Sequence, residues 1–451
     1  MEYKDAGIPY DLIYSVSKLS SKRNRVFYNP TTSQTMYSGG TGLTTFVISD
    51  PVVIDPSTVS IAGLWKLKAG STSANAINYV NPCASDLYSQ CILSLSGVQV
   101  SGQMNSYQHI SQRAYYVAQT DASYQNSHCL EGLNGMYLPP SQNGNISSIG
   151  GSIAAGVSGD ASLTSGIWLS LNNISCLRTN RLVDLSIFGK FALQLKSSGV
   201  NVVKGNDIGA RNCSWQLENL EMGVDVIAEL PPAYIELIKT LVAEKKQFKV
   251  NFSNEIAGYN TFQTNTLLNA STQSLDGFMV VPVVSATAYT EDANQNVPPC
   301  FRFQWGSTAT LGSSINFNFR VGAMSYPQSG SLRLLHNVAQ TTQESLFGDS
   351  LYAKHSLYCD GVNSVGQPTY SQLGYAKLNG VFFSCLAMLR QAGWAHPEQT
   401  LSGIPTWGNE YIITVNMSPD AVATPANLLL VAQTTSTVVY DSVSGGVSVI
   451  Q

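Results

Sequence analysis

The sequence predicts an all-β protein made of two tandem eight-stranded antiparallel jelly rolls with long loop insertions and a connector helix. Three observations favour this fold class. Apolar residues recur mostly with a period of two, one segment has a convincing helical pattern, and similar β segments recur in the same order in both halves of the 451-residue chain. Many strands bounded by turn residues, with long insertions between strand pairs, are typical of a jelly roll.

The strand pattern is clearest at residues 315–321, INFNFRV, where apolar and polar residues alternate. A strand turns successive side chains to opposite faces, so this segment predicts a half-buried strand. Ile315, Phe317, Phe319 and Val321 form the apolar face, and Asn316, Asn318 and Arg320 form the polar one. Further β-rich runs lie at 43–54, 59–67, 224–228, 277–287, 411–417 and 428–440.

The two halves of the chain share an ordered series of similar segments. GIWLS at 166–170 and GVFFS at 380–384 have the same order of residue types and lie about half a chain length apart. Three more pairs keep the same order: 92–100 with 315–324, FALQL at 191–195 with IITVN at 412–416, and 215–230 with 428–442. We therefore predict a tandem duplication.

The convincing helix covers residues 231–246, PPAYIELIKTLVAEKK, just past the middle of the chain. Two prolines suit a helix start, because the first N–H groups of a helix have no intrahelical partner. Glu236 lies near the expected positive end, Lys245 and Lys246 near the negative end. Tyr234, Ile238, Leu241 and Val242 form an apolar stripe. The predicted organisation is an N-terminal arm at 1–24, a first jelly roll at 25–230, the helix, and a second jelly roll with a short C-terminal tail at 247–451.

The composition is poor in charge, at 12% against a usual ~25%, and rich in Ser, Thr, Asn, Gln, Gly and Tyr. An apolar fraction of 44% argues against disorder, and a net charge of −4 excludes a broadly basic nucleic-acid binder. Scarce Lys and Glu with abundant Tyr suit large surfaces buried against neighbouring subunits.

Chemistry-bearing motifs do not stand out in the sequence. The five histidines have no metal-ligand spacing, the eight cysteines form no CxxC pair, and neither a P-loop nor a G-x-S-x-G elbow occurs. We therefore predict no catalytic, cofactor-binding or metal residues, and a protein that is not an enzyme. The beginning of the sequence does not read as a secretory signal, so the thiols are expected to be reduced, and no apolar run is long enough to span a membrane.

One basic cluster, SSKRNR at 20–25, contains the candidate functional residues Lys22, Arg23 and Arg25. Two interpretations remain open for it. The cluster is either a solvated arm, or an arm that contacts a polyanion or another subunit.

Three stretches resemble a known family: VDVIAELPPAYIELIKTLVAEKKQFKVNF at 224–252, STQSLDGFMVVPV at 271–283, and INFNFRVGAMSYPQSGSLRLLHNVAQTTQESLFG at 315–348. The first is similar to the last strand of a first jelly roll, a connector helix and the opening strand of a second. The second is similar to an early strand of the second barrel. The third is similar to a strand of the second barrel that is followed by a Tyr-Pro turn and a helical excursion. The family is the double jelly-roll major capsid proteins of double-stranded DNA viruses, which include those of adenoviruses, nucleocytoplasmic large DNA viruses, virophages and polinton-like viruses.

The resemblance implies a virion structural protein. Three chains would form a homotrimer, a pseudo-hexagonal capsomer that tiles an icosahedral shell and contacts other capsomers and minor capsid, cement and penton proteins. The loops at 101–165 and 325–379 would build towers or subunit contacts. The arm with Lys22, Arg23 and Arg25 would face the particle interior, toward minor proteins, an inner membrane or the genome. Such a protein is made and assembled inside the host cell and is not secreted. The alternatives are another virion surface protein, such as a penton or fibre, and a carbohydrate-binding or hydrolytic β-sandwich protein.

Overall fold

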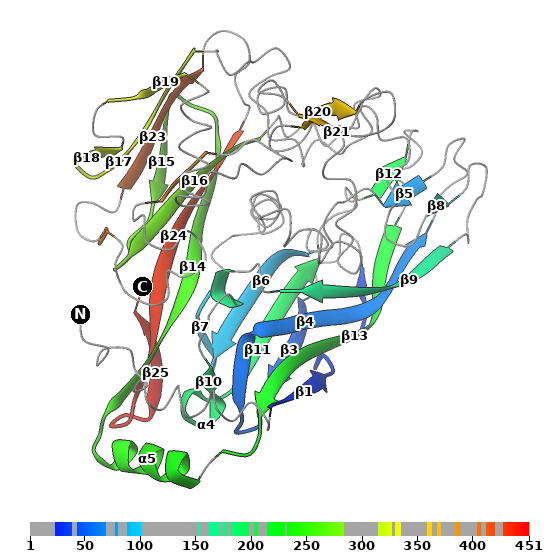
Figure 1. The fold of residues 1–451 in the computed structure, drawn as a ribbon, viewed down its shortest axis with the longest axis vertical. Coiled ribbons are helices and arrows are strands. Elements are labelled where there is room, and N and C mark those ends of the chain that lie inside the picture. The colour runs from blue at the N-terminus through cyan, green and yellow to red at the C-terminus, as the bar shows by residue number, and fades with distance from the viewer. Residues whose placement is uncertain are drawn as a thin grey trace.

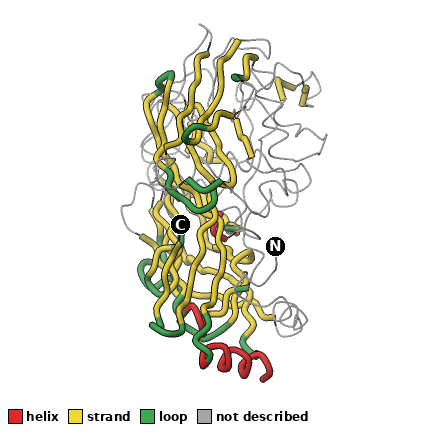
Figure 2. Tube along the Cα trace, turned by 90° about the vertical axis from the view of Figure 1, so that its left-hand side faces the viewer, coloured by secondary structure: helices red, strands yellow, loops and turns green. Residues whose placement is uncertain are grey.

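A computed structural model of the chain describes residues 23–37, 43–68, 77–79, 88–101, 152–153, 162–171, 175–177, 182–197, 203–205, 214–230, 232–283, 314–326, 330–334, 359–362, 368–370, 384–387, 404–406, 412–419 and 427–450. Antiparallel strands dominate these residues, and they form an elongated molecule with a helix at one end (Figures 1 and 2). Strands that precede residue 230 pair only with one another among the described residues, and so do strands that follow residue 246.

The first half of the chain forms two facing sheets. In one sheet, β13 and β4 lie at the centre, β1 and β2 pair with β13, and β9 and β10 pair with β4; in the other, the order is β3-β11-β6-β7. The bounds are β1 Arg23–Tyr28, β2 Met36–Tyr37, β3 Leu43–Ile48, β4 Val53–Lys68, β6 Tyr88–Leu95, β7 Val98–Gln99, β9 Ser162–Ser170, β10 Val183–Asp184, β11 Phe191–Ser197 and β13 Ser214–Ile227.

The second half forms another pair of sheets. One has the order β14-β24-β16-β22 with β25 also on β24, and the other has the order β15-β23-β17-β18 with β19 also on β17. The bounds are β14 Gln247–Thr261, β15 Asn265–Asn269, β16 Leu275–Val283, β17 Ser314–Val321, β18 Met324–Tyr326, β19 Leu332–Leu334, β22 Ser384–Ala387, β23 Ile412–Pro419, β24 Asn427–Asp441 and β25 Gly446–Ile450.

The two halves have the same strand topology. The orders β1-β13-β4-β9 and β3-β11-β6-β7 of the first half correspond, strand for strand along the chain, to β14-β24-β16-β22 and β15-β23-β17-β18 of the second. In each half the first, eighth, third and sixth of these eight strands make one sheet, and the second, seventh, fourth and fifth make the other. This is the arrangement of a jelly roll, so the predicted fold class of two tandem jelly rolls is confirmed.

Three of the four repeated pairs occupy equivalent strands, although one of these three alignments was wrong in phase; of GVFFS at 380–384 only Ser384, the first residue of β22, is described. Residues 92–100 lie in β6–β7 and 315–324 in β17–β18, and both hairpins turn through two residues, Ser96-Gly97 and Gly322-Ala323. In β11, Phe191, Leu193 and Leu195 are buried, whereas in β23 the buried residues are Ile413 and Val415. The predicted alignment, which pairs Phe191 with Ile412, is therefore displaced by an odd number of residues from the structural one. It places buried residues of one strand opposite outward-facing residues of the other.

Each jelly roll buries aromatic and aliphatic side chains between its two sheets. In the first, Trp65 of β4 stacks on Trp215 of β13, with ring centroids 5.4 Å apart. In the second, Phe278 of β16 and Phe319 of β17 come from opposite sheets, with centroids 5.3 Å apart. Phe317, Phe319 and Val321 are buried and Asn316 and Arg320 are exposed, which confirms the predicted faces over residues 316–321; the side chain of Ile315 lies outside those described.

Shorter elements flank the jelly rolls. They are β5 Ile77–Tyr79, β8 Ser152–Ile153 and β12 Val203–Gly205 in one small sheet, β20 Cys359–Val362 and β21 Pro368–Tyr370 in another, the 3₁₀ helix η5 Ser175–Leu177, and the helix α4 Leu185–Phe188. After the expected Tyr326-Pro327 turn, Leu332–Leu334 form the strand β19 on β17, and the helical excursion expected in this stretch stays a prediction. The rest of that stretch, and most of both long loops, lie outside the described residues.

The connector helix is present as α5, Pro232–Ala243, at one end of the molecule (Figure 1). It is shorter than predicted, so Glu236 lies beyond its first turn, and Lys245 and Lys246 lie past its end. The N–H of Lys246 bonds to the carbonyl of Leu241 and that of Lys245 to Val242, a Schellman ending with Lys245 at a positive φ of 58°. Tyr234 is buried and Ile238 and Leu241 are half-buried, whereas Val242 is exposed.

Candidate functional site

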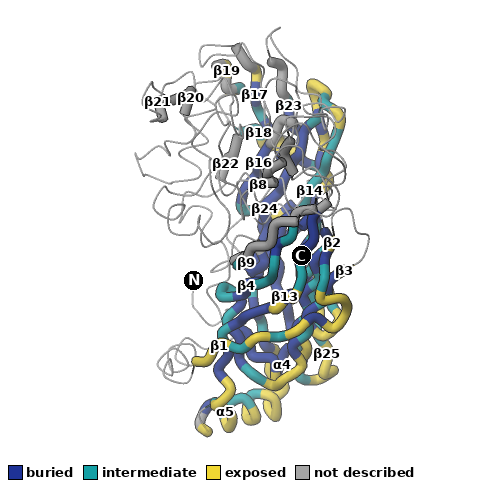
Figure 3. Tube along the Cα trace, turned by 90° about the vertical axis from the view of Figure 1, so that its right-hand side faces the viewer, coloured by how far each residue is buried: buried dark blue, intermediate teal, exposed yellow. Residues whose placement is uncertain are grey.

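The residues named from the sequence lie at the start of β1, an edge strand of the first jelly roll. Its six residues pair with β13 from Arg23 opposite Ile227 to Tyr28 opposite Met222, and none of the six is buried (Figure 3). Val26 and Tyr28 turn toward the sandwich and pack against its core. The alternate residues, Arg23, Arg25 and Phe27, therefore share the opposite face of the sheet.

A cluster of ion pairs holds this face of β1 to its neighbours. Arg23 Nε lies 2.9 Å from Asp225 Oδ2, and Arg25 Nη1 lies 3.0 Å from Asp225 Oδ1, so one carboxylate on β13 accepts from both arginines. Arg23 also pairs with Asp55 on β4. Ion pairs of partly exposed side chains each contribute about 0–1 kcal/mol, and more when they form a network.

Two further features of β13 and β4 shape this face. Arg25 donates to Ser60 Oγ and to the Gly223 carbonyl, with a distance of 3.3 Å for the latter. A Cβ at Gly223 would stand about 3.0 Å from atoms of Arg25 and Phe27, so both side chains lie across the space that a glycine leaves open. Phe27 remains 56% exposed. The outward face of β1 thus presents an apolar ring beside two arginines whose charges are already paired.

These contacts show that two of the three basic residues assigned to the arm belong to a strand instead. Arg23 and Arg25 belong to an ordered strand of the first jelly roll, where Asp55 and Asp225 balance their charge. Lys22 lies outside the described residues. That the three residues face a particle interior stays a prediction.

A buried hydrogen bond fastens the connector helix to the first jelly roll. The Tyr234 hydroxyl of α5 donates to Asp184 Oδ2 at 2.7 Å, while Asp184 Oδ1 accepts from the backbone N–H of Ser186 at 2.9 Å and caps α4. Burial, and to a lesser extent the Asp184 carboxylate, raise the pKa of Tyr234 well above its usual value of 10. This pair, which we call the latch, fixes the position where one jelly roll passes to the next.

The outer face of the β15-β23-β17 sheet is polar but carries little charge. Asn416 donates to Asn318 at 2.6 Å, and Asn318 donates to Ser331 at 3.0 Å, which makes a row of hydrogen bonds across neighbouring strands. Leu267 of β15 is 54% exposed on the same face. Such a face costs little to desolvate and therefore suits contact with another protein surface.

The described residues contain no cluster of three or more His, Cys, Asp or Glu side chains that could hold a metal ion. All five histidines lie outside them. Cys91 and Cys176 are buried and are not joined in a disulfide, and burial, with a smaller effect of Cys176, raises the pKa of Cys91. Among the helices of the described residues, none combines the length and the apolar character that a membrane crossing requires.

Sequence-based comparisons find no relatives of this chain. No protein-family model matches it, and no curated protein matches it either.

Comparison of structures does find similar chains. A chain of the Sputnik virophage structure is similar over 94% of this chain and 88% of its own length, with a TM-score of 0.56 and 12% identity. PBCV-1 VP54, in a structure fitted into a cryo-EM reconstruction of Sputnik, is similar over 95% and 96%, with a TM-score of 0.53 and 11% identity. A chain of the PBCV-1 virus capsid is similar over 94% of this chain and 96% of its own length, with a TM-score of 0.50 and 11% identity. The likeness, at such low identity, shows that this chain shares their fold.

Proposed function

We propose that the protein is a major capsid protein, a structural subunit that trimerises into pseudo-hexagonal capsomers tiling the icosahedral shell of a double-stranded DNA virus. One observation carries the proposal: the chain repeats an eight-stranded jelly roll twice, and it shares this fold with chains of the PBCV-1 capsid and the Sputnik virophage over nearly its whole length. On this proposal its place is the virion, and it has no catalytic step.

The physical properties of the described surfaces support this role. Two sandwiches with aromatic cores make a rigid block, which a tile of a shell requires. The edge of β1 and the outer face of β15-β23-β17, which carries little charge, can be covered by neighbouring copies at a low desolvation cost. Three copies related by a closed rotation would bury such edges in a heterologous ring.

The partners of the chain follow from the same proposal. Its main partner is itself, first in the homotrimer and then between capsomers. Minor capsid, cement and penton proteins would contact the completed capsomers. We assign the interior-facing role to the arm with Lys22, Arg23 and Arg25, with minor proteins, an inner membrane or the genome as its contact. Because Arg23 and Arg25 are paired with carboxylates, their part in this role is to anchor the arm.

The purified full-length chain tests the proposal. Light scattering coupled to size exclusion should give three times the chain mass, and negative-stain electron microscopy should show particles with a hexagonal outline. A chain that remains monomeric at all concentrations while it folds correctly by circular dichroism would overturn the capsomer. Binding or hydrolysis of glycans by that monomer would instead support a carbohydrate-active β-sandwich.

A further inference from the structure

One sheet of the second jelly roll extends beyond its own sandwich. β14 and β24 pair along all fifteen residues of each strand, but β16 pairs only with residues 427–434 of β24. From Thr437 to Asp441, β25 takes that side of β24 instead. Residues 247–253, 436–441 and 446–450 thus form a three-stranded extension, here named the ribbon, which Figure 1 shows beside the first jelly roll.

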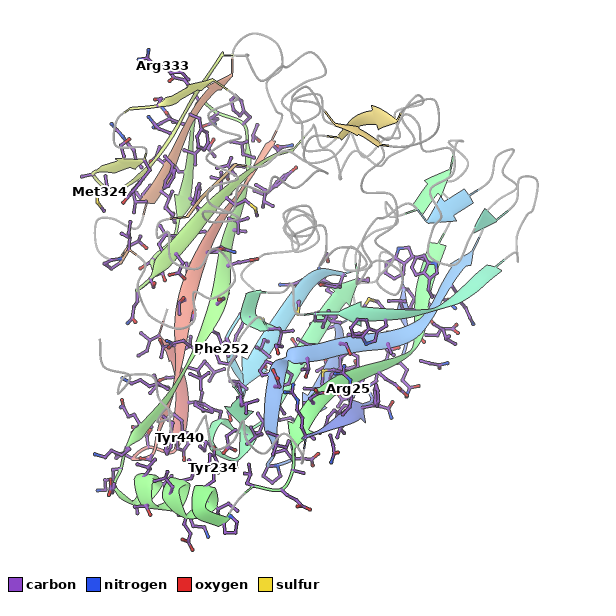
Figure 4. All side chains as sticks on the ribbon, in the orientation of Figure 1. Arg25, Tyr234, Phe252, Met324, Arg333 and Tyr440 are labelled. Atoms are coloured by element: carbon purple, nitrogen blue, oxygen red, sulfur yellow. The ribbon has the colours of Figure 1, made fainter. Side chains whose placement is uncertain are left out.

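The inner face of the ribbon belongs to the core of the first jelly roll. Phe248, Val250, Phe252 and Val438 are buried in one continuous cluster with residues of both sheets of that jelly roll, such as Phe46 and Trp65. Tyr440, Val447 and Val449 pack against the same cluster. Figure 4 shows Phe252 between the long strands and the first jelly roll. Buried residues of the second sandwich, such as Phe278 and Phe319, are outside this cluster.

On the opposite face of the ribbon, residues of the two flanking strands are half-exposed or exposed, whereas Thr437 and Val439 of the central strand β24 are buried. Lys249 and Asn251 are half-exposed, Ser448 is exposed, and Thr437 donates to Asn251 Oδ1 at 2.9 Å. The side of the ribbon that carries Phe248, Val250 and Val438 therefore faces the first jelly roll; these residues alternate with less buried ones in β14, but with buried ones in β24.

Neighbouring elements place the ribbon on one region of the first jelly roll. β14 lies beside η5, whose Cys176 and Leu177 are buried in the same core, and β25 lies beside β7. Ile238 and Leu241 of α5 pack against this core as well, next to the Tyr234–Asp184 latch. The connector and the ribbon together cover the side on which the first jelly roll meets the second.

We infer that the ribbon is a strap that completes the core of the first jelly roll, so that this jelly roll becomes stable only when residues near 436–450 have docked. The two sandwiches are separate in their strand pairing but share this core. During synthesis, residues 23–230 would stay incompletely packed until the ribbon emerges, which would delay any surface built on them. The inference concerns a single chain and does not depend on the proposed capsid role.

Hydrogen exchange of the purified full-length chain tests the strap. In Val438→Ala, amides of β6 and β11 should exchange about tenfold or more faster than in the unsubstituted chain, because a cavity opens in the shared core. Val431→Ala is the matched control, since Val431 is also fully buried in β24 but lies outside that core. It should affect β16 and β24 and leave β6 and β11 close to their original rates.

Faster exchange confined to β14, β24 and β25 in Val438→Ala would show that the first jelly roll is stable by itself and would overturn the inference. So would equal effects of both variants on β6. If Val438→Ala does not fold, Val449→Ser at the half-buried edge strand gives a milder loss with the same two outcomes. Val443→Ala, 66% exposed in the turn beside the ribbon, should leave β6 and β11 unchanged in either case.

Discussion

The first strands of the two jelly rolls, β1 and β14, occupy equivalent positions and are held in different ways. β1 has six residues, none buried, and ion pairs of Arg23 and Arg25 bind it to β13 and β4. β14 has fifteen residues, and Phe248, Val250 and Phe252 are buried in a core that it shares with the first jelly roll. In β1, ion pairs add to the packing of half-buried Val26 and Tyr28, whereas β14 is held mainly by apolar burial.

The difference shows how a duplicated fold can give equivalent strands distinct tasks. Topology fixes which neighbour each strand pairs with, but the length of the strand and the residues on its faces decide what it adds to stability. Among the described strands, β1 pairs on one side only, as does β14. β14 joins the two sandwiches within one chain.

The largest expected effect is the loss of stability when a charge is buried at corresponding positions in the cores of the two jelly rolls. Phe319→Asp in β17 and Leu95→Asp in β6 each bury a charge at a fully buried position of corresponding strands. Each should lower the free energy of unfolding by more than about 4 kcal/mol and abolish soluble, trimeric protein. Soluble yield and size exclusion measure the result, with Asn316→Asp and Ser94→Asp on the outer faces as controls. Correctly assembled Phe319→Asp or Leu95→Asp protein would contradict the strand assignment.

The latch between the jelly rolls predicts a smaller effect that depends on pH. Tyr234→Phe removes the donor to buried Asp184 and should reduce the free energy of unfolding by about 1–3 kcal/mol. Because folding raises the pKa of Tyr234, its contribution is present below about pH 10 and is lost as the pH rises above the unfolded value. In urea unfolding from pH 7 to 11, the difference in free energy of unfolding between the unsubstituted chain and Tyr234→Phe should therefore become smaller at alkaline pH. A difference that stays constant across this range would argue against the latch.

The ion pairs that hold β1 predict a change in the free energy of unfolding that depends on salt concentration. Asp225→Asn weakens the pairs with both arginines and should cost about 1 kcal/mol at low ionic strength, because these side chains are partly exposed. The difference should shrink in 1 M salt, which screens charges beyond roughly 3 Å. Denaturation at both salt concentrations measures it, and Glu221→Gln, exposed on the same strand, is the control. An effect independent of salt would mean that packing, not charge, holds β1.

The smallest effect concerns the end of the connector helix, where the chain enters β14. Lys245→Gly relieves a left-handed conformation at φ 58° and should raise the free energy of unfolding by about 0.5–1 kcal/mol. Lys246→Gly, at a neighbouring exposed position with no positive φ, should give no such gain. Thermal denaturation of both variants tests the Schellman ending, which equal effects would contradict.

The sequence predicted strands well where one face meets water and the other a core. Phe317 and Phe319 alternate with Asn316 and Asn318, and the structure buries the predicted pair. The strand predicted at 428–440 is also present as β24, but alternation did not indicate which of its residues are buried, because both of its faces are covered. Residues 433–437 of β24, QTTST, are polar yet buried, and Thr435 donates to Asp276 at 2.7 Å. Hydrogen bonds across the sheet make such burial possible, and these partners lie far away in the chain.

The candidate site was predictable in part. The sequence drew attention to Arg23 and Arg25, but not to Asp225, which lies about 200 residues away and neutralises both. Nor did it indicate that Tyr234, recognised as part of an apolar stripe, would donate to Asp184. Ion pairs and buried hydrogen bonds of this kind have no local signal, because they form only after strand pairing has brought the residues together.

By itself, the sequence determined the class of fold, its duplication and the position of the connector, because alternation, helical periodicity and turn residues act over short distances. The tertiary structure alone decided that β14, β24 and β25 pass beyond their own sandwich to close the core of the other one. An apolar pattern in a sequence predicts only that a face will be buried. Which surface buries them depends on the twist, length and packing of whole sheets.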